Sequence, residues 1–145
     1  MIAILMAAYN GERYIAQQIE SILNQTETGW KLTVRDDCSR DATVSVIRRY
    51  TEKYPEKIGI LETEKNSGSA KNNFFRLMED ADGDYVMFSD DDDVWLPEKI
   101  QTTLLKMKEL ERNFGTDTPL LVHTDLKVAD ENLRAQLAEK YPAVY

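Results

Sequence analysis

The sequence predicts an α/β fold in which a mostly parallel β-sheet carries helices on both faces. Short apolar runs alternate along the chain with longer segments whose apolar residues recur every three or four positions. The short runs are typical of buried strands, and the longer segments are typical of amphipathic helices. The predicted order is β-α-β-α-β-α-β-α-β, and this alternation indicates parallel strands joined by helical crossovers.

Five apolar runs are the predicted strands. The first, Ile2-Ala-Ile-Leu-Met-Ala-Ala8, is apolar throughout, as expected of a strand that is buried on both faces. The others cover residues 30–35, 58–61, 85–88 and 120–126. His123, the only histidine, lies in the last run, so we expect it to be packed rather than catalytic.

The segments between these runs are the predicted helices. The first is expected to bury an isoleucine-rich face and to expose Gln18 and Ser21. Asp41 is a candidate N-cap of the second helix, and Pro97 stands where the fourth should begin. The residues expected to face the core are Tyr14, Ile15, Ile19, Ile22 and Leu23 in the first helix, Val46, Ile47, Tyr50 and Tyr54 in the second, Phe74, Leu77, Met78 and Ala81 in the third, and Ile100, Leu104, Met107, Leu110 and Phe114 in the fourth.

Composition and charge restrict the class of protein. The 145 residues are enough for a single domain with a hydrophobic core, and the 42% hydrophobic and 30% charged shares are typical of a soluble globular protein. The net charge of −8 argues against nucleic acid or an anionic membrane surface as a partner, but a cation can still bring a phosphorylated ligand to an acidic site. The single cysteine, Cys38, excludes an internal disulfide and fits a reducing, cytoplasmic compartment. No run approaches the roughly 20 apolar residues of a membrane span.

Four consecutive carboxylates, Asp90 to Asp93, follow the fourth apolar run. They precede the helix start at Pro97, so they occupy the carboxyl end of a strand, where open α/β sheets bind ligands. Adjacent carboxylates repel one another, and this raises their pKa values unless a cation relieves the charge. Oxygen ligands suit a hard divalent ion such as Mg²⁺ or Mn²⁺, which also binds phosphate oxygens. The alternative interpretation is a solvated acidic loop.

Polar groups also follow the first three predicted strands, at Tyr9-Asn10, Asp36-Asp37 and Asn66-Ser67-Gly68. In a parallel sheet these groups lie along the same edge as the four acids. A carboxylate after the second strand is placed to accept hydrogen bonds from a base or a ribose, although Asp36 or Asp37 can equally cap the following helix. Gly68 either lets the backbone approach a ligand or simply turns the chain. Lys71 either meets a phosphate or is an ordinary surface lysine.

Two other functional classes stay open on these residues. Asp90-x-Asp92-x-Val94 after an apolar strand matches the aspartyl-nucleophile motif of haloacid-dehalogenase-like phosphatases, with Asp90 as the nucleophile, although those proteins carry the motif on their first strand. A non-catalytic nucleotide-binding or interaction module is the second alternative. The sequence contains neither a G-x-x-x-x-G-K-[ST] phosphate loop nor a G-x-G-x-x-G motif.

Taken together, several motifs resemble the inverting family 2 glycosyltransferases, which have the Rossmann-like GT-A fold. The matching pieces are Met6-Ala-Ala-Tyr-Asn-Gly11, Ser21-Ile-Leu-Asn-Gln-Thr26, Val34-Arg-Asp-Asp-Cys-Ser39, Asp41-Ala-Thr43, Asn66-x-Gly68 and Phe88-Ser-Asp-x-Asp-Asp-Val-Trp95. The last piece looks most like the bacterial rhamnosyltransferase-like branch, whose members build cell-surface polysaccharide.

The resemblance implies a role for each matched position. Tyr9 and Asp37 would line the base pocket, with Asp36 beside them and Asp91 near the ribose. Asp90 and Asp92 would hold Mg²⁺ or Mn²⁺, with Asp92 the direct ligand. The full set of implied nucleotide-sugar-binding residues is Ala7, Tyr9, Asp36, Asp37, Asn66, Gly68, Lys71, Asp90 and Asp91.

The resemblance also implies the reaction. The donor would be a dTDP- or UDP-sugar, plausibly dTDP-rhamnose, and the acceptor a saccharide or glycolipid. The catalytic base of the family would lie beyond residue 145, so we expect residues 1–145 to be the donor-binding part of a longer protein, which would lie in the cytoplasm or peripherally at the inner face of the membrane. Two positions depart from the branch: Asp91 stands where glutamine is usual, and Cys38 where glycine is usual.

Overall fold

The computed structural model describes residues 1–130 and 132–134. The chain divides into two compact units, Met1–Gln101 and Thr102–Tyr145, and each is described by itself. Within the described residues, all of the strands and most of the helices belong to the first unit. That residues 1–145 serve as one nucleotide-sugar-binding domain stays a prediction.

The first unit contains a four-stranded, fully parallel sheet with the strand order β3-β2-β1-β4. The strands are β1 (Ile2–Ala8), β2 (Trp30–Asp36), β3 (Ile58–Glu62) and β4 (Tyr85–Asp90). Every residue of β1 is buried, as its unbroken apolar sequence predicts for a central strand. The predicted parallel α/β architecture is therefore confirmed.

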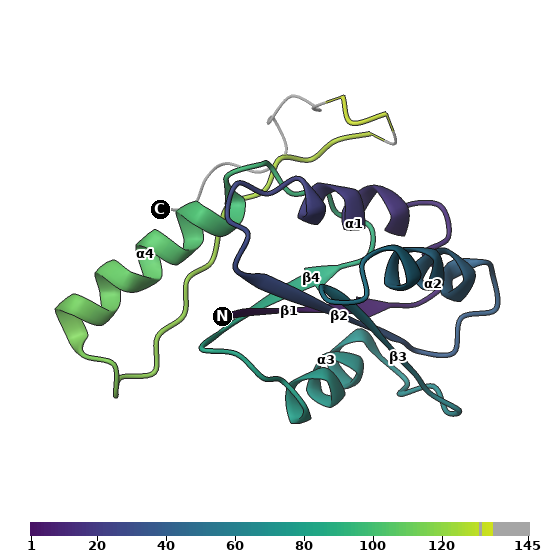
Figure 1. Cartoon of the computed structure of the whole chain (residues 1–145), viewed down its shortest axis with the longest axis horizontal. Helices are drawn as coiled ribbons and strands as arrows, with labels where there is room; N and C mark the ends of the chain where they lie inside the picture. The colour runs from purple at the N-terminus through teal and green to yellow at the C-terminus, as the bar shows by residue number, and fades with distance from the viewer. Residues whose placement is uncertain (131, 135–145) are drawn as a thin grey trace. The chain divides into compact units, whose positions relative to one another are not determined.

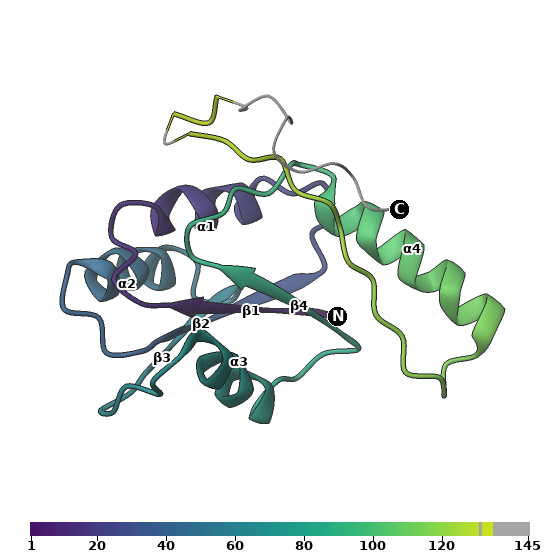
Figure 2. The same ribbon diagram turned by 180° about the vertical axis from the view of Figure 1, so that it is seen from behind.

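Helices cover both faces of this sheet (Figures 1 and 2). α1 (Ile15–Leu23) and α2 (Thr43–Lys53) lie on one face, and α3 (Ala70–Glu79) lies on the other. On the α3 side, Leu5 and Ala7 of β1 pack against Leu77. Both tryptophans are buried in the first unit, with Trp30 4% and Trp95 5% exposed.

The direction of strand addition reverses at β1. From β1 the chain moves outward through β2 to β3, and it then returns to place β4 on the other side of β1. Ala7 is paired with Arg35 on one side and with Asp90 on the other, so the carboxyl ends of β1, β2 and β4 lie side by side. A reversal of this kind opens a crevice at the strand ends, where ligands bind in open α/β sheets.

Three predictions about the helices are wrong in detail. Gln18 and Ser21 of α1 are buried, because the segment that follows β4 packs over this flank of the helix. Met78 is 40% exposed, because α3 meets the sheet through its Leu77 side. Asp41 is not the N-cap: α2 begins at Thr43, and Oδ1 of Asp41 accepts the Thr43 N–H from one position before the cap.

Helix α4 (Lys99–Phe114) begins after the turn at Pro97, and Phe114 is 62% exposed rather than directed inward. The predicted strand over residues 120–126 is wrong: this segment is not a strand, and Leu121 and Leu126 are 80% and 75% exposed. A strand needs a neighbour that completes its backbone hydrogen bonds, and no pairing with residues 120–126 occurs in the described part of the chain. His123 is accordingly exposed rather than packed. None of the helices in residues 1–130 and 132–134 has the length and apolar character needed to span a membrane.

Candidate functional site

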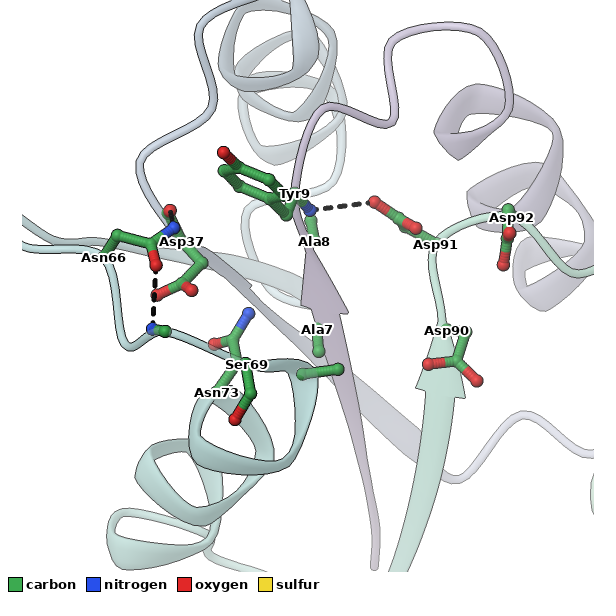
Figure 3. A pocket seen from close by; sticks show the side chains of 12 residues that line it. Ala7, Ala8, Tyr9, Asp37, Asn66, Ser69, Asn73, Asp90, Asp91 and Asp92 are labelled. Carbon is green, nitrogen blue, oxygen red and sulfur yellow. Dashed lines mark hydrogen bonds between the residues drawn. The ribbon is translucent and has the colours of Figure 1, made fainter.

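A pocket of about 630 Å³ lies at the carboxyl ends of β1, β2 and β4 (Figure 3). It is lined by Ala7, Ala8, Tyr9, Asp37, Asn66, Gly68, Ser69, Ala70, Asn73, Asp90, Asp91 and Asp92. The structure thus brings together most of the residues selected from the sequence. Asp36 and Lys71 do not line the pocket, whereas Ala8, Ser69, Ala70 and Asn73 do line it and were missed.

One wall of the pocket is built around Asp37, which is 4% exposed. Nη1 of Arg35 donates to Oδ1 of Asp37 at 3.0 Å and to Oδ1 of Asn73 at 2.6 Å. The backbone N–H and the hydroxyl of Ser67 donate to the same carboxylate, each at 2.8 Å. The Asp37 carboxylate is therefore held in one orientation by Arg35 of β2 and by Ser67 of the loop before α3. Asn73 of α3 in turn holds the guanidinium group of Arg35.

Sequence reasoning missed Arg35, although a signal was present. Arg35 lies between Val34 and Asp36 at the end of the second predicted strand, and an arginine that is buried there needs a partner, because buried arginine is almost always paired. The partner Asn73 lies 38 positions away in the sequence, and no local pattern connects the two residues.

The loop before α3 closes the pocket beside Asp37. Nδ2 of Asn66 donates to the backbone oxygen of Asp37 at 2.6 Å, and its Oδ1 accepts the N–H of Gly68 at 2.7 Å. Gly68 has φ +88°, a left-handed conformation that glycine adopts without strain. Ser69 then caps α3 by accepting the N–H of Asn72, so the positive end of this helix opens on the pocket.

Asp36 does not cap the following helix, because α2 begins at Thr43; it stabilises the turn that precedes the helix instead. It is 3% exposed, and its Oδ2 accepts the N–H of Ser39 at 2.9 Å. Its Oδ1 is the buried side-chain oxygen that has no hydrogen-bond partner within the described residues. Cys38 in the same turn has φ +65°, which explains why glycine is usual at this position.

Lys71, the other selected residue outside the pocket, is exposed on the first turn of α3. Its ammonium group lies 5.7 Å from the centroid of the Phe75 ring, in cation–π range. Its predicted contact with a phosphate stays a prediction.

The opposite wall of the pocket is acidic. Asp90 ends β4, and Oδ2 of Asp91 accepts the N–H of Tyr9 at 3.0 Å, as Figure 3 shows. Burial raises the pKa of Asp91 to about 6, and the charges of Asp92 and Asp90 add to this rise, against the Tyr9 hydrogen bond. Burial also raises the pKa of Asp90, with the charges of Asp93 and Asp92 acting in the same direction. A cation in the pocket would relieve this repulsion.

The carboxylates of this wall do not form a closed metal cage. Among residues 1–130 and 132–134, no three carboxylate, imidazole or thiol groups converge as a preformed metal centre. Mg²⁺ is usually held by one or two carboxylates and completes its shell with water and substrate phosphates. Asp90 and Asp92, which both line the pocket, fit a metal site of that open kind.

Gly11 leaves the space that the Asp91 carboxylate occupies. A Cβ at position 11 would lie 2.8 Å from Cγ of Asp91 and closer still to Oδ2.

We expect Gly11→Ala to lower the free energy of unfolding by about 1–3 kcal/mol, because the Asp91 carboxylate must then give up its hydrogen bond from the Tyr9 N–H. Urea denaturation measures this, with Gly59→Ala as control, since a Cβ at Gly59 meets nothing within 4 Å. Adding Asp91→Ala should recover part of the loss, and full additivity of the two losses would contradict the assigned contact.

Comparison with known proteins identifies the class of this fold and then its family. The likeness to solved structures places this parallel sheet with its strand reversal in the GT-A fold class. Residues 1–349 of the Staphylococcus aureus protein TarS, solved in complex with UDP-GlcNAc, superpose with a TM-score of 0.64 at 27% identity over 74% of this chain and 31% of that chain. Glycosyl transferase family 2 matches residues 3–119. The chain belongs to this family, as its motifs predict.

Two relatives show the kinds of enzyme found in this family. The dTDP-rhamnosyl transferase RfbG of Shigella flexneri is 38% identical over 102 residues, which are 68% of this chain and 35% of RfbG. The Escherichia coli UDP-Glc:alpha-D-GlcNAc-diphosphoundecaprenol beta-1,3-glucosyltransferase WfgD is 31% identical over 109 residues, which are 74% of this chain and 41% of WfgD. The chain thus spans less than half the length of either relative.

Proposed function

We propose that this chain forms the donor-binding part of a glycosyltransferase that takes its sugar from a nucleotide-diphospho-sugar. The observation that carries the proposal is the pocket at the strand reversal, with the fixed Asp37 carboxylate on one wall and Asp90 to Asp92 on the other. A nucleoside diphosphate has the matching order of groups: a base with hydrogen-bond donors, a ribose and a charged diphosphate. Membership of glycosyl transferase family 2 supports the same function.

Each wall would bind a different part of the donor. The Asp37 carboxylate, held by Arg35 and Ser67, would accept an N–H of the base, while Tyr9, which is 52% exposed, would pack against it. Asp90 and Asp92 would hold Mg²⁺ or Mn²⁺ beside the diphosphate. The bound ion would offset the negative charge of the departing nucleoside diphosphate. The N-terminus of α3 would favour the same charge from the other side.

For the donor sugar we propose rhamnose carried on dTDP, with transfer in one displacement that inverts the anomeric carbon. The support is the similarity to a dTDP-rhamnosyl transferase. For the acceptor we propose a cell-surface polysaccharide or a glycolipid, because WfgD by its name acts on a diphosphoundecaprenol-linked sugar. Family membership leaves the phosphohydrolase alternative without support. Location in the cytoplasm, or peripherally at the inner face of the membrane, remains a prediction.

Calorimetric titration of dTDP, UDP and GDP, each with and without Mn²⁺, tests the proposed function. We expect one nucleotide to bind and Mn²⁺ to strengthen its binding about tenfold or more, and we expect Asp92→Asn to lose that enhancement. Asp93→Asn is the matched control, because it removes the same charge from the same loop at a position that does not line the pocket. Failure of all three nucleotides to bind, or equal effects of the two substitutions, would contradict the proposal.

A further inference from the structure

Gln18 is a buried polar side chain that faces the acidic segment rather than solvent. It lies in the middle of α1 and is 0% exposed. Its neighbours Ser21 and Ser89 are 9% and 2% exposed, so water does not replace their hydrogen bonds. A buried amide that lacks hydrogen-bond partners destabilises the fold, so the identity of the groups that Gln18 contacts is informative.

The amide orientation that satisfies every hydrogen-bonding position of Gln18 ties α1 to both ends of the acidic segment. Nε2 then donates to the backbone oxygen of Asp93 at 2.8 Å and to Oγ of Ser21 at 2.8 Å. Oε1 accepts from Oγ of Ser89 at 2.7 Å and from the indole Nε1 of Trp95 at 3.1 Å. The opposite orientation sets donor against donor, so the hydrogen-bond network selects this one.

These contacts bracket the carboxylates of the pocket. Ser89 directly precedes Asp90, and Asp93 directly follows Asp92. Ser21 strengthens the same attachment, because its Oγ also accepts the backbone N–H of Trp95 at 3.0 Å. The segment is thus fixed on both sides of the three acids that line the pocket.

A second buried glutamine, Gln25, forms its hydrogen bonds to residues outside the acidic segment. Its Nε2 donates to the backbone oxygens of Leu96 at 2.8 Å and Ser21 at 3.1 Å, and its Oε1 accepts the N–H of Ile100 at 3.0 Å. Gln25 is 6% exposed, so its burial is close to that of Gln18. The two residues therefore differ mainly in which part of the chain they hold.

We propose that Gln18 is a positioning residue that holds Asp90 and Asp92 at the separation needed for the divalent ion and the diphosphate. Three adjacent carboxylates repel one another, and a free loop would let them move apart. Groups that orient metal-binding side chains in this way typically contribute 10–100-fold to metal affinity. The inference rests on the proposed donor site, because a site without metal would have nothing to position.

The test compares Gln18→Met with Gln25→Met in the calorimetric titration, using the nucleotide that binds the parent protein. Methionine keeps the volume of glutamine and removes its hydrogen bonds. We expect Gln18→Met to reduce the Mn²⁺ enhancement of nucleotide binding about tenfold, with metal-free affinity unchanged because the Asp37 wall is untouched. We expect the two substitutions to lower the Tm by similar amounts, because both remove buried hydrogen bonds. Gln25→Met, however, should keep the Mn²⁺ enhancement of nucleotide binding.

Ser89→Ala removes one partner of Gln18 with a smaller effect on folding, so it serves if Gln18→Met does not fold. It should reduce the Mn²⁺ enhancement in the same direction, by about two- to fivefold. If Gln18→Met folds and keeps the full Mn²⁺ enhancement, the role of Gln18 is overturned and the donor site stays intact. If Gln18→Met does not fold, an unchanged Mn²⁺ enhancement in Ser89→Ala has the same meaning. An equal loss of enhancement in Gln25→Met would also overturn it, since the effect would then follow general stability. If the parent protein shows no Mn²⁺ enhancement with any nucleotide, the proposed function itself is wrong and the role of Gln18 falls with it.

Discussion

Replacing Arg35 by methionine should lower the free energy of unfolding by about 3–5 kcal/mol, a large part of the stability of a typical domain. The side chains of Arg35 and Asp37 are 8% and 6% exposed and form an ion pair at 3.0 Å. Methionine would leave the Asp37 carboxylate buried with only its hydrogen bonds from Ser67, and it would leave Oδ1 of Asn73 without its donor. Urea denaturation at pH 7 measures the loss.

Two further variants distinguish the cost of leaving the Asp37 carboxylate buried without its partner from the cost of losing an arginine side chain. Arg35→Met combined with Asp37→Leu should regain much of the lost stability, because no uncompensated charge remains buried. Arg48→Met removes an arginine whose pair with Glu62 is exposed, at 57% and 43%, and it should cost at most about 1 kcal/mol. If Arg48→Met cost as much as Arg35→Met, the special role of the buried pair would be refuted.

Asp91→Asn should stabilise the metal-free protein at pH 7.5 by about 1–2 kcal/mol after allowance for solvent screening of a partly exposed carboxylate. Burial, aided by the charges of Asp92 and Asp90, raises the pKa of Asp91 from 3.8 to about 6 in the folded protein. Asparagine keeps an oxygen for the Tyr9 N–H and carries no charge. The usual glutamine at this position in the rhamnosyltransferase-like branch is neutral in the same way.

The same pKa shift predicts how stability depends on pH. Below pH 3.8 the carboxyl group is protonated in both folded and unfolded chains, and it carries no charge penalty. Between pH 3.8 and about 6 the unfolded chain loses this proton while the folded chain keeps it, so stability falls as the pH rises. Asp91→Asn should reduce this fall in a series of denaturation curves from pH 4 to 7.5, and the part that remains comes from Asp90 and Asp93, whose pKa values burial also raises. Asp82→Asn, at an exposed position in the turn before β4, should keep the fall, and a parent-like profile for Asp91→Asn would refute the assignment.

The sequence alone predicted the parallel sheet and the edge at which the pocket lies. Apolar strands such as Ile2–Ala8 and the acids that follow β4 are local patterns, and parallel strands bring their carboxyl ends to one edge whatever the side chains between them. For this reason Tyr9, Asp37 and Asp90 could be grouped before their contacts were known. The family motifs lie on the same loops, and so they carry the same information.

Tertiary structure decided which polar residues support the pocket. Gln18 and Ser21 lie on one flank of α1 and Gln25 follows the end of that helix, but the burial of all three depends on a segment that arrives about 70 residues later. Arg35 meets Asn73 only because α3 packs beside β2. Residues 120–126 have the composition of a strand and pair with no other strand among residues 1–130 and 132–134. In each of these cases the outcome depends on a partner distant in the sequence, whereas helix and strand periodicity reports only which side of an element is apolar.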